Sequence, residues 1–345
     1  MKDKGNKIGI LYFFIHFIIE ITSFYVLTTY INSNIIWMLA LMYDFYAFVP
    51  QGIFGYFKDK GIKVNFALFG VILSSLSLVL LYFNVNAILV ILSIAIGNCL
   101  IHIEGAETTL RHSNGKMSPS AIFVSGGSFG VITGKILGSN NVSVLIILAI
   151  NLLMLVLLAI CNKIEKSSKD DKSLSKYNYS NKNLNAKVII LLATLVVIVR
   201  SFMGYGIPTG WNKSLIQSIL LFCFMGTGKA LGGILIDHIG IRKTVIVSTL
   251  CSLPFLIFGE KLMIVSLIGI MLFSMTMAIT LALIVSELKK YPGVAFGFTT
   301  LGLFLGSIPF FVFKINNIVI NMIIVIVLTI LSYILLNIIC KKEGK

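Results

Sequence analysis

The sequence has little charge. Asp, Glu, Lys and Arg make up 12% of its 345 residues, whereas hydrophobic residues make up 57%. A soluble domain carries about 25% charged residues, so too little polar sequence remains here to coat one. Runs of about 18 or more nearly uncharged residues recur instead, and each could cross a hydrocarbon core of about 30 Å. Because lipid offers the backbone no hydrogen-bond partners, these runs are predicted to be helices. The composition therefore predicts an all-α membrane protein.

Recognisable catalytic and metal-binding patterns are also missing. The five cysteines lie singly in apolar runs, without a Cys-x-x-Cys pair, and are expected to be unreactive packing thiols. His102 and Glu104 are two residues apart, about 200° around a helix, so they are not expected to share a metal ion. No nucleophile stands in a recognisable arrangement with a base. We therefore expect no metal, no cofactor and no enzymatic activity.

The apolar runs predict twelve membrane-spanning helices in two sets of six. A polar segment rich in Lys, Ser, Asn and Asp separates the sets and is predicted to be a flexible cytoplasmic linker. The predicted organisation is an N-terminal bundle over 1–162, a linker over 163–186 and a C-terminal bundle over 187–345. The spans are placed at 8–30, 35–57, 64–83, 87–110, 119–138, 143–162, 187–207, 214–236, 244–259, 262–286, 292–313 and 317–340.

The net charge of +15 is distributed unevenly between the two sides of the predicted membrane. Of the 28 basic residues, 22 fall in the termini and in alternate connections, including the linker. The opposite connections hold only Lys213, Lys261 and Lys314. By the positive-inside rule both termini are predicted to be cytoplasmic, which requires an even number of spans. The basic excess is thus a topology signal, and no nucleic-acid partner is expected.

Two similar loops relate the halves. Gly55-x3-Asp59-x-Gly61-x-Lys63 ends the second span, and Gly233-x3-Asp237-x2-Gly240-x-Arg242-Lys243 ends the eighth, at an offset of about 178 residues. Glycine permits close approach of a neighbouring helix, and an aspartate can sit at the positive N-terminal end of a helix. We expect Asp59 to contact the helix that begins at Pro292, and Asp237 to contact Arg242 and the helix that begins at Pro119. Such contacts would hold the cytoplasmic side closed.

These loops resemble the cytoplasmic loop motif of the major facilitator superfamily. Other segments resemble a narrower branch, the fosmidomycin-resistance type of exporter: His16-Phe17-x2-Glu20, Pro50-Gln51, Phe54-Gly55-Tyr56, His102-Ile103-Glu104-Gly105, Phe123-x2-Gly126-Gly127-x2-Gly130 and Arg200-Ser201. The sequence departs from the branch pattern at Glu20, which replaces Asp, and at Ile103, which replaces Pro. The resemblance implies two six-helix bundles with a site between them at mid-membrane, and it favours antiport.

Ionisable residues inside the spans are costly, so each is a functional candidate. The acids and histidines lie in the first half and the fixed cations in the second, and a cavity between the halves would place acids opposite cations. Arg200, which is always charged, suits an anionic group of a substrate. The alternative is a structural role, in which these groups form ion pairs that hold the spans together, as expected for Glu107 with Arg111. The candidates for the substrate and proton pathway are His16, Glu20, Asp44, His102, Glu104, Arg200 and Lys229.

Span five repeats glycine at Gly126, Gly130, Gly134 and Gly138, which predicts a ridge that lets a neighbouring helix approach closely. Lys135 in the same span is expected to extend to the membrane surface.

The sequence thus predicts a monomeric, proton-coupled exporter of a small anionic or amphipathic compound. Its partners would be the lipid bilayer, the substrate and protons. A symporter or uniporter for nutrient uptake is the main alternative, and a non-transporting sensor is a remote one. The abundance of Ile, Lys and Asn is typical of an AT-rich bacterial genome and predicts a bacterial cytoplasmic membrane.

Overall fold

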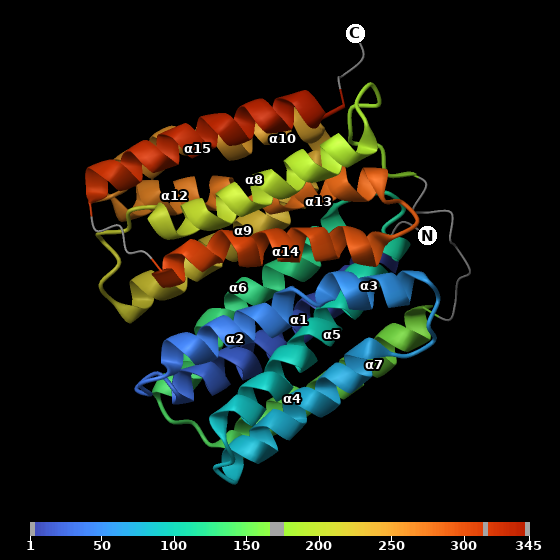
Figure 1. Cartoon of the computed structure of the whole chain (residues 1–345), viewed down its shortest axis with the longest axis vertical. Coiled ribbons are helices and arrows are strands. Elements are labelled where there is room, and N and C mark those ends of the chain that lie inside the picture. Colours follow the sequence, from blue (N-terminus) through green and yellow to red (C-terminus); the bar gives the residue numbers. More distant parts are fainter. Residues whose placement is uncertain (1–3, 166–175, 313–316, 342–345) are drawn as a thin grey trace.

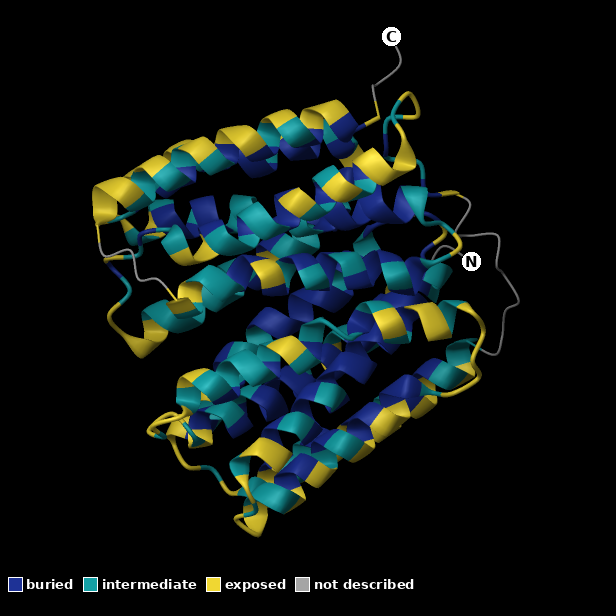
Figure 2. Ribbon diagram, in the orientation of Figure 1, coloured by how far each residue is buried: buried dark blue, intermediate teal, exposed yellow. Residues whose placement is uncertain are grey.

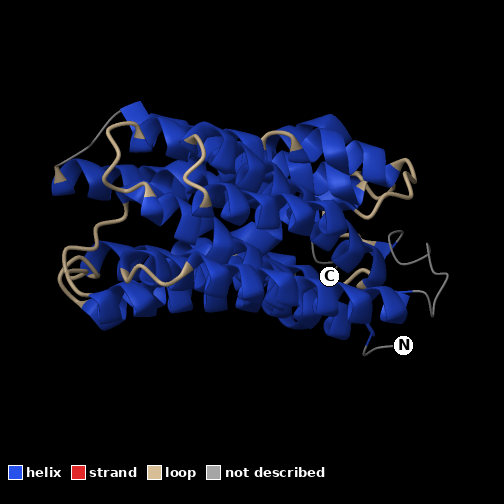
Figure 3. Ribbon diagram, turned by 90° about the horizontal axis from the view of Figure 1, so that it is seen from below, coloured by secondary structure: helices blue, strands red, loops and turns tan. Residues whose placement is uncertain are grey.

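The computed structural model describes residues 4–165, 176–312 and 317–341 and contains helices without a strand in those ranges (Figures 1 and 3). The predicted all-α class is therefore confirmed. The first half consists of α1 (Lys4–Thr29), α2 (Ile36–Phe48), α3 (Gln51–Asp59), α4 (Phe66–Tyr82), α5 (Ala87–His112), α6 (Ser118–Ser139) and α7 (Val144–Glu165). The second half consists of α8 (Ala186–Gly206), α9 (Leu215–Ile239), α10 (Ile241–Ile246), a π-helical turn (Val247–Cys251), α11 (Ser252–Phe258), α12 (Met263–Ser274), α13 (Thr276–Glu287), α14 (Pro292–Val312) and α15 (Ile318–Ile339).

Each predicted span overlaps one to three consecutive helical elements. Within the described residues, ten helical segments are long and apolar enough to cross a membrane, and α4 is a shorter apolar helix of 17 residues. The prediction of one continuous helix over 35–57 is wrong, because the chain breaks at Pro50 into α2 and α3. Proline has no N–H to donate to the preceding turn, which explains an interruption at this position. The chain is a multi-pass membrane protein.

Helices α1–α7 pack together, as do α8–α15, and the two groups meet along α3 and α6 of the first and α14 and α9 of the second (Figure 1). The charged and polar loops lie at the ends of the helices, and both termini lie at the same end. Large apolar side chains are exposed on the outward faces of peripheral helices (Figure 2), among them Phe69, Ile72, Leu153, Ile323 and Val327. Their exposure is what contact with lipid tails requires.

The glycine ridge of α6 packs closely against a neighbouring helix, which is α1. A Cβ atom added at Gly126, Gly130 or Gly134 would meet a backbone carbonyl oxygen of α1, and one at Gly138 would lie 2.7 Å from Thr28 Cβ. The two backbones therefore touch along four turns. A side chain on the ridge would force the helices apart.

We expect Gly134→Val to lower the free energy of unfolding by about 1–3 kcal/mol, because the added atoms would overlap the Ile21 carbonyl of α1. Thermal unfolding of the purified protein in detergent measures the change. Gly204→Ala is the control, since a Cβ there meets no atom within 4 Å. Equal melting temperatures for both variants and the wild type would show that the ridge is not a close helix contact.

The linker is partly ordered, which corrects the prediction that all of 163–186 is flexible. Residues 163–165 belong to α7, whereas 166–175 lie outside the described residues. Beyond them, Tyr177 is fully buried and its hydroxyl contacts Ser113, and Ser180 forms a backbone bridge with Cys340. Tyr179 donates a hydrogen bond to the Gly115 carbonyl oxygen (2.8 Å). The second part of the linker thus packs against both halves of the molecule.

Candidate functional site

Asp59 joins the two halves at the end that carries the termini. Its carboxylate accepts hydrogen bonds from the backbone N–H groups of Gly293 (3.0 Å) and Val294 (2.9 Å), in the first turn of α14. A negative charge is stabilised there by the unpaired N–H groups and the helix dipole. The glycines bring the backbones together, since a Cβ added to Gly55 would lie 2.5 Å from Gly293. The predicted partner of Asp59 is therefore confirmed.

Asp237 makes the equivalent contact from the second half to the first. It accepts from the backbone N–H groups of Met117 and Ser118, each at 2.9 Å, and from the Ser118 hydroxyl, at the start of α6. The helix that holds Pro119 is thus its partner, as predicted. Arg242, predicted to pair with Asp237, donates instead to the Asn337 carbonyl oxygen of α15 (3.4 Å). We call the Asp59 and Asp237 contacts the end contacts.

Tyr179 of the linker adds to the second end contact. Its hydroxyl lies 3.4 Å from Asp237 Oδ1, in addition to its bond with Gly115. Burial and the nearby Asp237 carboxylate raise the pKa of Tyr179 above its ordinary value. The phenol therefore stays protonated at neutral pH and can donate.

A cavity of about 640 Å³ lies between the two halves, toward the end opposite the termini. Helices α1 and α6 of the first half and α8, α9 and α12–α14 of the second contribute its walls. Among the described residues that line it are three cationic side chains and no carboxylate. The cationic and aromatic lining residues are Lys135, Arg200, Lys229, Phe24, Tyr205, Phe222 and Phe273. The cavity is thus positively charged with largely apolar walls.

Arg200 is the most deeply buried of the three cations, with 7% of its surface exposed. Its guanidinium stacks 3.3 Å from the centre of the Phe273 ring, and Nη2 donates to the Phe273 carbonyl oxygen. Its Nε and Nη1 atoms have no hydrogen-bond partner among the residues that the structure describes. An unsatisfied buried donor is costly, and a charged one more so. The stacked Phe273 ring thus holds an incompletely hydrogen-bonded guanidinium in the cavity wall.

Lys135 was missed as a cavity residue by sequence reasoning, which placed its ammonium at the membrane surface. Lys135 is exposed, near the end of α6, and its ammonium lies over the Phe24 ring (5.5 Å) and the Phe222 ring (5.2 Å), one from each half. The sequence did offer one signal for a cavity position: Lys135 lies inside the predicted span 119–138, several residues before its C-terminal end. Lys229, a predicted site residue, lines the same cavity.

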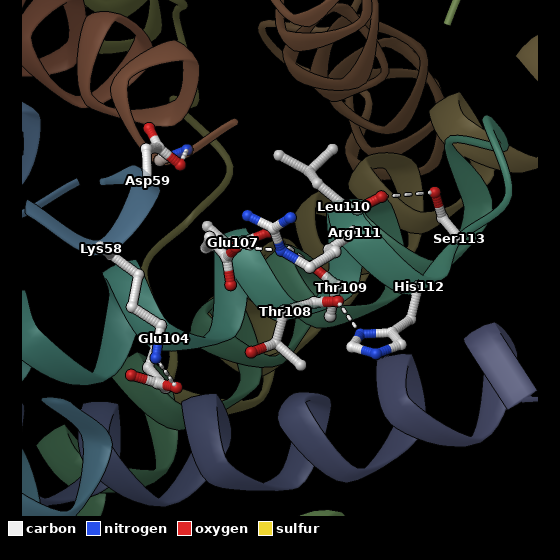
Figure 4. A network of polar contacts seen from close by, with 12 residues as sticks. Lys58, Asp59, Glu104, Glu107, Thr108, Thr109, Leu110, Arg111, His112 and Ser113 are labelled. Carbon is white, nitrogen blue, oxygen red and sulfur yellow. Dashed lines mark hydrogen bonds and ion pairs between the residues drawn. The ribbon is translucent and has the colours of Figure 1, made fainter. Parts of the chain in front are cut away.

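Glu104 does not lie opposite the cations. It is 5% exposed, pairs with Lys58 Nζ at 2.6 Å and accepts from the Phe66 N–H (3.0 Å) at the start of α4 (Figure 4). Glu107 pairs with Arg111, as predicted. The expectation that acids and cations face each other across the cavity is therefore wrong for Glu104, which is bound within the first half.

Asp44 lies on α2, close enough to interact electrostatically with Glu20 and with Tyr205 of the cavity wall. Its side chain is half-buried.

His16, Glu20 and His102 form a buried cluster that the sequence did not reveal. Glu20 Oε1 lies 3.6 Å from Nε2 of each histidine, and the two Nε2 atoms are 2.8 Å apart. His16 and Glu20 share a face of α1, as expected, but the approach of His102 from α5 depends on helix packing. The expectation of no metal site considered His102 with Glu104 alone, whereas the donors that converge are those of His16, Glu20 and His102.

Comparison with known proteins identifies the fold. No family model and no curated protein matches the sequence. Among solved structures, the E. coli fucose:proton symporter FucP superposes with a TM-score of 0.65 at 14% identity, covering 96% of this chain and 97% of that one. FucP in the outward conformation, described as a major facilitator superfamily transporter, gives 0.64 at 13% identity, covering 96% and 97%. A bacterial homologue of the iron transporter ferroportin, in an outward-facing state, gives 0.60 at 11% identity, covering 97% and 98%. The chain has the fold of major facilitator superfamily transporters.

Proposed function

We propose that this protein is a secondary active transporter of the major facilitator superfamily that exports a small anionic compound with an apolar body in exchange for protons. The observation that carries the proposal is the cavity between the halves. Its three cations, without a lining carboxylate, favour an anion, and its aromatic walls favour an apolar body. Arg200 supplies a buried positive charge in the cavity wall, which favours an anionic group such as a carboxylate or phosphonate.

Alternating access is supported by where the halves touch. The end contacts and the Gly55–Gly293 approach close the end that carries the termini, while the cavity lies toward the other end. With the positive-inside orientation, this is an outward-facing state, as in two of the similar structures. Each end contact joins a carboxylate of one half to a helix start in the other, so breaking both would let the halves rock open toward the cytoplasm.

Proton coupling rests on two acids of the first half, the buried Glu20 and the half-buried Asp44. The two interact electrostatically, and one proton on the pair would relieve the repulsion between their carboxylates. Moving one proton down 100 mV supplies about 2.3 kcal/mol, enough for roughly a fifty-fold substrate gradient. Uptake by proton symport is the alternative, and the similarity to a fucose:proton symporter favours it. The narrower branch resemblance favours export.

The test uses purified protein in proteoliposomes. Aromatic carboxylates and phosphonates are first screened by thermal shift, each beside its uncharged amide or ester. We expect stabilisation by the anions and not by their uncharged counterparts.

Each binder is then added to vesicles that hold a pH gradient, and an internal dye reports its dissipation. We expect anions that bind to dissipate the gradient. When the anion is added outside, antiport dissipates a gradient that is acidic inside, whereas symport dissipates one that is acidic outside. Binding without any change in the gradient would exclude proton coupling, and selective binding of the uncharged compounds would exclude the anion assignment.

A further inference from the structure

The cluster of His16, Glu20 and His102 lies within the first half and outside the cavity lining. The first two come from α1 and the third from α5, and each side chain is buried, with 5 or 6% of the residue exposed. The cluster is a compact set of two imidazoles and one carboxylate. No role in anion binding accounts for it.

The hydrogen bonds of the two rings fix where their protons lie. His16 Nδ1 is 2.9 Å from the Phe123 carbonyl oxygen, and His102 Nδ1 is 2.9 Å from the Asn98 carbonyl oxygen. A carbonyl oxygen can only accept, so both Nδ1 atoms carry hydrogen and both neutral rings present a lone pair at Nε2. The two Nε2 atoms that carry these lone pairs are 2.8 Å apart. Two neutral rings would repel there, so the contact calls for a positive centre between them.

The position of Glu20 indicates the kind of centre. The Nε2 atoms and Glu20 Oε1 form a triangle with sides of 2.8, 3.6 and 3.6 Å. The point equidistant from its corners lies about 2.0 Å from each, the bond length of Zn²⁺ and similar ions to imidazole nitrogen and carboxylate oxygen. A shared proton explains the nitrogen–nitrogen contact alone. A metal ion also explains why the carboxylate oxygen is equally far from both rings.

The surroundings hold the donors in place. The Asn98 amide donates to Glu20 Oε1 (3.0 Å), and the same amide nitrogen lies 2.9 Å from the Tyr43 hydroxyl. Gly127 leaves room beside His16, since a Cβ there would lie 2.5 Å from Nε2. Histidines whose Nδ1–H is bound to a carbonyl, with a hydrogen-bonded carboxylate, are the usual arrangement around a protein-bound metal.

We propose that His16, Glu20 and His102 bind one divalent first-row transition-metal ion, with coordination positions left open. Two imidazoles and one carboxylate are donors that Zn²⁺, Fe²⁺ and Co²⁺ accept. Asp44 and Lys229, one of each charge sign, lie close enough to interact electrostatically with Glu20.

The test is a titration of Co²⁺ into the full-length protein, purified without a histidine tag and stripped with a chelator. We expect a visible ligand-field band that saturates at one ion per chain and is displaced by Zn²⁺. Absence of the band in the folded wild type, the result for a site that holds only a proton, overturns the proposal. No substrate or pH gradient is involved, so the outcome is independent of the transport assignment.

Variants locate the ion. Glu20→Gln and His102→Gln are each expected to weaken Co²⁺ binding at least about tenfold. Mutating a residue that only hydrogen-bonds to a metal ligand already lowers metal affinity by about that factor, so loss of a ligand should lower it at least as much. The matched control is His112→Gln, since His112 also lies on α5 and its Nδ1 bonds a carbonyl oxygen, that of Thr108, outside the cluster. Circular dichroism checks that each variant is folded. Unchanged affinity in folded Glu20 and His102 variants would place the ion elsewhere.

Discussion

Replacing Arg200 with alanine is expected to lower the kcat/KM for transport of an anionic substrate at least about 100-fold. Hydrogen bonds to a charged group contribute about 1.5–3 kcal/mol each, and the substitution removes the guanidinium from the cavity wall together with any such bonds that it makes to the anion. Initial rates of radiolabelled anion uptake into proteoliposomes measure the loss.

The control for Arg200→Ala is Lys213→Ala, which removes a cation at the same end of the molecule that is not among the cavity-lining residues. Arg200→Lys is expected to restore a small part of the rate, because lysine keeps the charge and loses the planar guanidinium that stacks on Phe273. A structural role would instead affect charged and uncharged ligands equally. Anion preference that persists in Arg200→Ala would show that the guanidinium does not bind the anion.

Breaking both end contacts by Asp59→Asn with Asp237→Asn is expected to shift the protein toward the inward-facing state. Each carboxylate accepts two backbone N–H bonds at a helix start, and loss of its charge costs about 1 kcal/mol or more. Two contacts then change the equilibrium between states by at least about tenfold, and transport slows because one state predominates.

Spin labels on Lys63→Cys and Lys290→Cys, in a background without the native cysteines, report the change by double electron–electron resonance. These exposed positions lie near the Asp59 contact on the two halves. The distance distribution should gain a longer component in the double variant. Glu260→Gln, which neutralises an acid away from both contacts, should leave it unchanged. A distribution equal to the wild type in the double variant would mean that the end contacts do not hold the closed state.

The sequence predicted contacts between helices best where a local pattern indicates both residues of the contact. The Gly-x3-Asp loops carry a carboxylate at a helix end, and Pro119 and Pro292 mark the helix starts that need one, so the end contacts followed from the two patterns. The α6 glycines likewise predicted a close helix contact, although α1 as the partner became evident only in the structure.

Which way a side chain faces inside the bundle was much harder to predict. The spans are apolar nearly all round, so hydrophobic periodicity does not distinguish the cavity from lipid or from a neighbouring helix. The sequence therefore predicts a pathway position for both Glu104 and His102, whereas the structure pairs Glu104 with Lys58 and places His102 beside His16 and Glu20. The ordered half of the linker was missed for a related reason: Tyr177 and Tyr179 are held by Ser113, Gly115 and Asp237, contacts that only the fold brings together.

Counterflow tests the central claim, that this cavity carries an anion across the membrane by alternating access. Proteoliposomes are loaded with an excess of an unlabelled anion that stabilises the protein and are then diluted into a trace of the same labelled anion, without a pH gradient. The account predicts a transient accumulation of label above equilibrium, absent with Arg200→Ala. Binding of the anion without any such overshoot in the wild type would contradict it and indicate a protein that binds its ligand without transporting it.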